Sequence, residues 1–194
     1  MSAPRTGPRA RSHKRSALAT LDPVELAGVL EELLRSRPEL RAEAERVARE
    51  QLARADLEAV AEQVESELWS LSIDELNGRA GRQPGGYVDP TEAAWELLGE
   101  AVAAHDRELA RLIELGMIAA ALDTALGLIA GLYRCQGCEN HELLLSWDPD
   151  FPIEHACSVV GDLAKAGIDV PRELLAELAP EWAASLTSAR RSRR

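Results

Sequence analysis

Five of the seven cysteine and histidine residues of this chain lie between positions 135 and 157. Thiolate sulfur and imidazole nitrogen are the ligands that zinc prefers, and four of them close a tetrahedral structural site. Three stand in the run Cys135-Gln-Gly-Cys138-Glu-Asn-His141, with the two-residue cysteine spacing of a zinc knuckle. His155 and Cys157 follow on an expected helix, where residues two apart point to nearly opposite faces. The predicted ligand set is therefore Cys135, Cys138, His141 and Cys157, with His155 as a substitute.

Other interpretations of the same cluster stay open. Cysteine is among the most buried residue types and often packs as a small hydrophobic side chain. A redox-active dithiol at Cys135 and Cys138 is disfavoured because no strand–helix–strand context surrounds it. A zinc ion with an open coordination position and a nearby carboxylate, Glu139 or Glu142, would instead make a metal-dependent enzyme.

No second constellation of catalytic residues accompanies the cluster. The glycine-rich stretch 78–86 lacks the lysine and Ser/Thr of a phosphate-binding loop and follows no expected strand. The chain has no Glu-x-x-His motif of the di-iron kind and no nucleophile elbow. Asp150, two residues before Pro152, is expected to cap a helix rather than to bind a cation. The sequence therefore favours a protein without catalytic activity.

Charge is distributed unevenly along the chain. The net charge is −11, but the first 20 residues carry +5 and the last five carry +4, which leaves −20 on the body between them. An acidic body repels phosphate backbones, so any nucleic-acid binding would have to come from the basic tails. The basic start has no apolar signal-peptide core, and the longest uncharged apolar run, 124–133, is too short to span a membrane. We expect a soluble, cytoplasmic protein.

Helical signals recur throughout the sequence. Asp22, Ser72 and Asp89 each precede a proline or a glutamate at the spacing typical of a helix start. Gly116 predicts a helix end. The segment 117–134 is apolar on every side and rich in alanine and glycine, which predicts a central helix that its neighbours approach closely.

Glycine and proline suggest one internal boundary. Six of them fall in residues 78–90, which we interpret as a connector between two helical subdomains. Basic tails, of which the first is expected to be disordered, complete the chain. The predicted organisation is a tail at 1–20, subdomains at 21–77 and 91–188 on either side of the connector, and a tail at 189–194.

Four short segments carry a resemblance to known proteins: Gly86-Tyr87-Val88, Ala93–Leu98, Arg111–Gly116 and Gly127–Arg134. Over about residues 57–165, the chain resembles a group of bacterial all-helical, helical-repeat-like proteins of unknown function. The shared residues are structural and apolar. The resemblance therefore implies a helical fold and no active site.

Together these observations predict an all-α protein of about nine to eleven helices, stacked as antiparallel pairs in an α-solenoid-like or irregular bundle. The expected function is that of a non-enzymatic cytoplasmic scaffold or protein-interaction protein, with a structural zinc ion at the Cys/His cluster as one interpretation. The alternatives are a metal-dependent enzyme that uses the cluster and a nucleic-acid accessory protein that acts through its tails.

Overall fold

The computed structural model describes residues 17–136 and 144–192. The chain divides into two compact units, Met1–Ala48 and Arg49–Arg194. The first unit contains a 3-10 helix, helix α1, a second 3-10 helix and the start of α2, with bounds Ala17–Thr20, Pro23–Ser36, Pro38–Leu40 and Arg41–Leu52. The second unit contains the remaining elements: α3 Leu57–Ser70, α4 Ile73–Arg79, β1 Gly81–Gln83, β2 Gly86–Val88, α5 Pro90–Glu114, α6 Ile118–Arg134, a 3-10 helix Leu144–Ser146, α7 Phe151–Lys165, α8 Arg172–Leu178 and α9 Ala183–Ser192.

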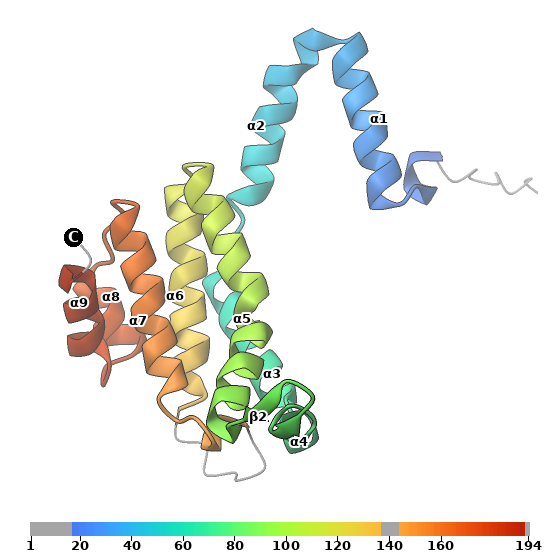
Figure 1. Ribbon diagram of the computed structural model, residues 1–194. Coiled ribbons are helices and arrows are strands. Elements are labelled where there is room, and N and C mark those ends of the chain that lie inside the picture. The colour runs from blue at the N-terminus through green and yellow to red at the C-terminus, as the bar shows by residue number, and fades with distance from the viewer. Residues whose placement is uncertain (1–16, 137–143, 193–194) are drawn as a thin grey trace, which may run out of the picture. The chain divides into compact units, whose positions relative to one another are not determined.

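The all-α prediction is confirmed, since the described residues form nine α-helices and one two-stranded ribbon. In the second unit, α6 is the central element and packs against α3, α5, α7 and α8. Figure 1 shows α5, α6 and α7 side by side, and α9 packs against α7. In a solenoid each repeat contacts only its neighbours, whereas here four helices all pack against the same helix, α6. The arrangement is an irregular bundle around α6.

Side-chain caps start the helices where the sequence predicted them. Asp22 accepts a hydrogen bond from the backbone N–H of Glu25, whose carboxylate accepts one from the N–H of Asp22. Ser72 and Glu75 form the same reciprocal pair before α4. Gly116, beyond the end of α5, has a φ of 66°, a left-handed conformation that suits glycine best. These ends are set by residues three or four positions apart.

Two glycines bring α3 and α6 into close contact. A Cβ atom built on Gly127 would lie 2.6 Å from the carbonyl oxygen of Leu57, and one on Gly131 would lie 2.7 Å from that of Ala61. The Cβ of Val64 would also be only 2.7 Å from the added atom on Gly131. The predicted close approach to the central helix is therefore present, and its partner is α3.

The segment 78–90 differs from a plain connector. Its strands pair antiparallel, with Arg82 opposite Tyr87. The Gln83 Nε2 donates to the carbonyl oxygens of Gly78 and Arg79, at 3.2 and 3.0 Å, and so holds this hairpin to the end of α4. The strands are three residues each, too short to show period-two alternation in the sequence.

The unit boundary also differs from the predicted one. It lies at 48/49, whereas the expected connector 78–90 lies inside the second unit. The reason is that α3, before the hairpin, packs against α6, after it. Helical structure also extends into both expected tails. Ala17–Thr20 form a 3-10 helix, and α9 continues to Ser192. The Thr20 hydroxyl stabilises this 3-10 helix at residues 17–20 by donating a hydrogen bond to the Ala17 carbonyl oxygen at 2.7 Å.

Candidate functional site

The structure places some of the predicted zinc ligands and leaves two outside its description. Cys135 follows the last turn of α6 and is 2% exposed, within the hydrophobic core. Cys157 lies on α7, half-buried against the same core. Cys138 and His141 lie outside the described residues. Within residues 17–136 and 144–192, no three Cys, His, Asp or Glu side chains gather as a metal-binding group.

The substitute ligand His155 has partners of its own. Its Nε2 lies 3.1 Å from Oδ1 of Asp106 on α5, and its ring stacks on Phe151 at a centroid distance of 5.3 Å. Phe151 in turn meets Trp95 of α5 edge-on at 5.0 Å. His155 therefore faces α5 and ties α7 to it.

A second histidine–carboxylate pair involves His105, the residue of α5 immediately before Asp106. The Nε2 of the buried His105 lies 2.8 Å from Oε2 of Glu67 on α3. The other carboxylate oxygen of Glu67 accepts a hydrogen bond from Nε2 of Gln63 at 3.1 Å. The sequence analysis did not predict this pair, although the position of His105 in the sequence indicates that its side chain is buried. His105 occupies an apolar position in the helical series that runs through Val102 and Leu109.

A pocket of about 390 Å³ lies in the second unit beside this pair. Its walls come from α3, α5 and α6 and from the last residues of α2 and the turn after it. The volume falls within the range of small-molecule sites, which is roughly 300–1,000 Å³. The polar lining consists of Gln51, Arg54, Gln63, His105, Glu108 and Thr124.

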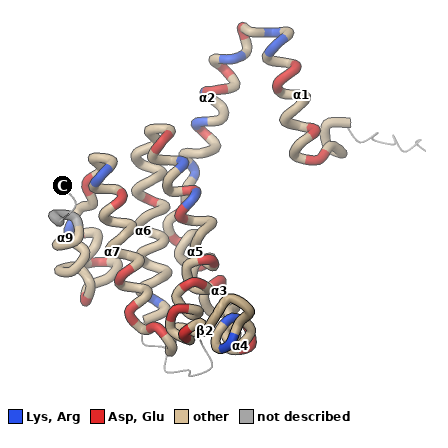
Figure 2. The backbone as a smooth tube through the Cα atoms, in the orientation of Figure 1, with Lys and Arg blue, Asp and Glu red and all other residues tan. Residues whose placement is uncertain are grey.

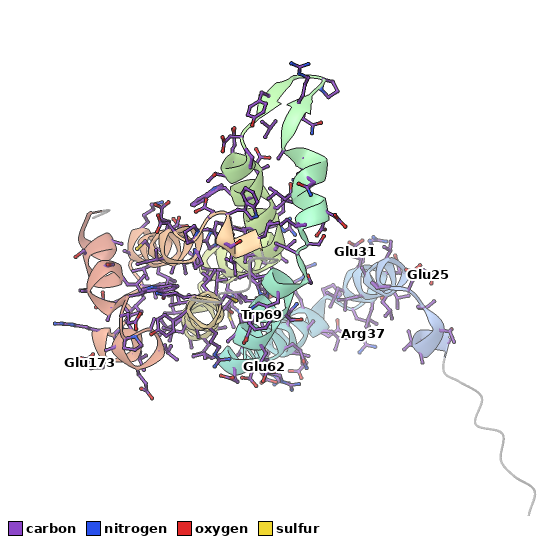
Figure 3. All side chains as sticks on the ribbon, turned by 90° about the horizontal axis from the view of Figure 1, so that it is seen from below. Glu25, Glu31, Arg37, Glu62, Trp69 and Glu173 are labelled. Atoms are coloured by element: carbon purple, nitrogen blue, oxygen red, sulfur yellow. The ribbon has the colours of Figure 1, made fainter. Side chains whose placement is uncertain are left out.

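A larger hollow, about 480 Å³, lies along α3 and is lined by Glu62, Trp69 and neighbouring residues. Figure 3 labels Glu62 and Trp69, which both belong to that helix. Trp69 is 48% exposed, and the described lining comes from one helix alone. We regard it as open surface, because one helix face cannot surround a ligand, whereas the smaller pocket is walled by several elements.

Ion pairs fix the helices around these features. Arg134 of α6 donates to Oε2 of Glu58 on α3 at 2.7 Å, which lowers the pKa of the Glu58 carboxyl. Arg79 of α4 and Glu100 of α5 form a bidentate ion pair, in which the two terminal guanidinium nitrogens donate to the two carboxylate oxygens at 2.7 and 2.6 Å. This pairing lowers the pKa of the Glu100 carboxyl. Acidic positions recur along α3, α5 and α7 in Figure 2. The cations at these crossings therefore offset local negative charge.

Asp150 is the N-cap residue of α7, as expected, but its side chain does not cap the helix. Asp150 precedes the helix but makes no side-chain capping bond. Instead, Oδ1 of Asp148 accepts a hydrogen bond from the Phe151 N–H at 3.2 Å. Burial raises the pKa of the Asp148 carboxyl, although hydrogen bonds from the backbone N–H groups of Phe151 and Asp150 oppose the shift. Asp150 is thus the N-cap residue by position, and the side-chain hydrogen bond at this helix start comes from Asp148 instead.

Comparison with known proteins identifies no relative. No protein-family model matches the chain. No curated protein and no solved structure matches it either. The functional interpretation therefore rests on the chain's own residues.

Proposed function

We propose that this protein is a non-enzymatic, cytoplasmic scaffold or protein-interaction protein whose helix α1 binds the partner. The observation that carries the proposal is the apolar face of α1. Leu26, Val29, Leu30 and Leu33 follow one another at helical spacing, and each is between 41% and 49% exposed. A surface helix normally buries such a face.

Among its described residues, the first unit leaves this face exposed. No described side chain of α1 or α2 is buried. A hollow of about 530 Å³, lined mostly by charged side chains that include Glu31, Arg35 and Arg41, lies between the two helices. Helices of 14 and 12 residues are only marginally stable in water when nothing packs against them. A bound protein would supply the missing contacts.

The charged side chains of α1 indicate what kind of protein would bind its apolar face. Acidic side chains lie on α1, with Glu25 at the edge of the apolar face and Glu31 farther round the helix (Figure 3). Amphipathic helices bind by laying their apolar face into a groove, and anchors at i, i+3, i+4 and i+7 are typical of this mode. We therefore propose a partner with an apolar groove and a basic rim. No helix in the described part of the chain is both long and apolar enough to cross a bilayer.

The zinc interpretation belongs to the same proposal in a structural role. Zn²⁺ held by Cys135, Cys138, His141 and Cys157 would join the segment after α6 to α7 and contribute folding energy directly. The burial of Cys135 at the end of α6 supports a structural rather than a catalytic role, because a catalytic ion needs an open position.

The experiment compares two single substitutions on α1. Leu30→Glu places a charge in the centre of the apolar face, whereas Val24→Glu changes an 81% exposed residue on the opposite side of the helix. Each tagged variant and the wild type are purified from the source cells, and bound proteins are quantified by mass spectrometry. A protein enriched with the wild type is then purified, and its affinity for all three forms is measured directly.

The proposal expects about a tenfold or greater loss of affinity for Leu30→Glu, since burying an unpaired carboxylate is costly. Val24→Glu should bind as the wild type does. Equal binding by both variants would contradict the assignment of this face. If the wild type forms a homodimer in sedimentation equilibrium and Leu30→Glu dissociates it, the partner of α1 is a second copy of this chain and not a different protein.

A further inference from the structure

The pocket between α3, α5 and α6 contains a hydroxyl with no partner, on a threonine that is otherwise buried. Thr124 of α6 is 3% exposed and lines the pocket. Its hydroxyl makes no hydrogen bond to any residue that the structure describes, unlike that of Thr187, which donates to the Ala183 carbonyl oxygen at 2.6 Å. In the described part of the chain no buried side-chain oxygen or nitrogen lacks a partner. The little of Thr124 that stays accessible therefore includes its hydroxyl, which faces the pocket.

His105 adds a hydrogen-bond acceptor to the same wall. A carboxylate can only accept, so the short contact with Glu67 makes Nε2 of His105 the N–H donor. In a neutral imidazole the other nitrogen, Nδ1, is then an acceptor. Gln63 is oriented in the same way, because its Nε2 donates to Glu67 and leaves its amide oxygen as an acceptor. This side of the pocket suits a ligand that brings an O–H or N–H group.

The charges of the pocket favour an anion. Both carboxylate oxygens of Glu108 are occupied by Arg111, at 2.8 and 2.7 Å, and both of Glu67 are occupied by His105 and Gln63. The guanidinium of Arg54 forms no ion pair with any described residue. It is the pocket's one cation, as far as the described lining extends, and carboxylates match its geometry.

Apolar side chains lie among these polar groups. Leu52, Val60 and Leu112 contribute to the lining. Small-molecule sites combine apolar side chains with fixed polar groups, and the lining of this pocket contains both kinds.

We propose that this pocket binds a small organic acid with an apolar middle, whose carboxylate pairs with Arg54 and whose hydroxyl or N–H group donates to His105 Nδ1 and meets the Thr124 hydroxyl. The proposal is independent of partner binding by α1, because the pocket residues belong to the second unit. It is a binding function and includes no chemical step.

Three matched compounds test the ligand chemistry. The probe 3-(4-hydroxyphenyl)propanoate carries both polar ends, 3-phenylpropanoate lacks the hydroxyl, and 4-propylphenol lacks the carboxylate. Binding to the full chain is measured by titration calorimetry and by ligand-observed NMR. We expect a dissociation constant of about 1 mM or below for the first compound and binding about tenfold weaker for each of the others.

Two variants and their controls locate the site. Thr124→Val keeps the side-chain shape, and Arg54→Gln removes the charge. Their controls are Thr187→Val, whose hydroxyl bonds to its own helix, and Arg107→Gln, an exposed arginine of α5 outside the pocket lining. We expect about a fivefold to tenfold weaker binding with Thr124→Val and tenfold or more with Arg54→Gln, whereas both controls bind as the wild type does.

Folding defects are separated from binding by the melting midpoint. Thr124→Val should leave it unchanged or raise it, because the hydroxyl has no partner to lose. The proposal is overturned if the first compound fails to bind at about 10 mM, if all three compounds bind equally, or if Thr124→Val and Arg54→Gln bind it as tightly as their controls.

Discussion

Adding one methyl group at Gly131 should destabilise the protein, although the same change at most helix positions would stabilise it. Glycine inside a helix costs roughly 0.5–1 kcal/mol relative to alanine. The Cβ of Gly131→Ala, however, would lie 2.7 Å from the Ala61 carbonyl oxygen and 2.7 Å from Val64 Cβ. Backbone and a β-branched side chain cannot move aside without shifting α3.

The expected magnitude follows from these contacts. Overpacking of a close-packed core costs about 1–3 kcal/mol, which exceeds the gain in helix propensity. We therefore expect Gly131→Ala to lower the free energy of unfolding by roughly 1–2 kcal/mol and Gly131→Leu to lower it further. For a chain of this size, each kcal/mol corresponds to about 2–4 °C in the melting midpoint.

Gly99→Ala on α5 is the matched control, because a Cβ there meets nothing within 4 Å. It should raise stability by about 0.5–1 kcal/mol. Urea unfolding followed by circular dichroism measures both variants, with unchanged slopes expected. If Gly131→Ala raises the midpoint as Gly99→Ala does, α3 does not cross α6 at this residue and the packing argument is refuted.

Two further predictions concern α7 and the segment before it. If the Cys/His cluster binds zinc, elemental analysis should find about one equivalent. Cys138→Ser and Cys157→Ser should each remove most of the metal, and chelator should add no further loss of stability, because all three treatments empty one site. Absence of zinc together with chelator-insensitive melting would refute the metal site. Asp148→Asn keeps the acceptor for the Phe151 N–H and removes a carboxylate whose pKa is raised by burial. A raised pKa means that ionisation destabilises the fold, so the variant should melt higher than the wild type at pH 7, and the difference should vanish as the pH falls below the ordinary aspartate pKa of about 3.9. Equal midpoints across the whole pH range would contradict this.

Sequence determined where α1, α4 and α5 begin, because caps act over three or four residues. Asp22 with Glu25, and Ser72 with Glu75, need no contact from elsewhere in the chain. The small residues of 117–134 also predicted a helix that its neighbours approach closely, since the absence of side-chain bulk is a property of the sequence. Strands of three residues fell below what period-two alternation can detect.

Tertiary structure alone decided which distant residues meet. That α3 contacts Gly131, and that Glu67 meets His105 across 38 positions, depends on how whole helices pack. The same holds for the pocket around Thr124, because its lining comes from four parts of the chain. His105 stood at an apolar position in the sequence, but its partner could not be identified from the pattern. Periodicity shows which face of a helix is buried, whereas only packing shows what buries it.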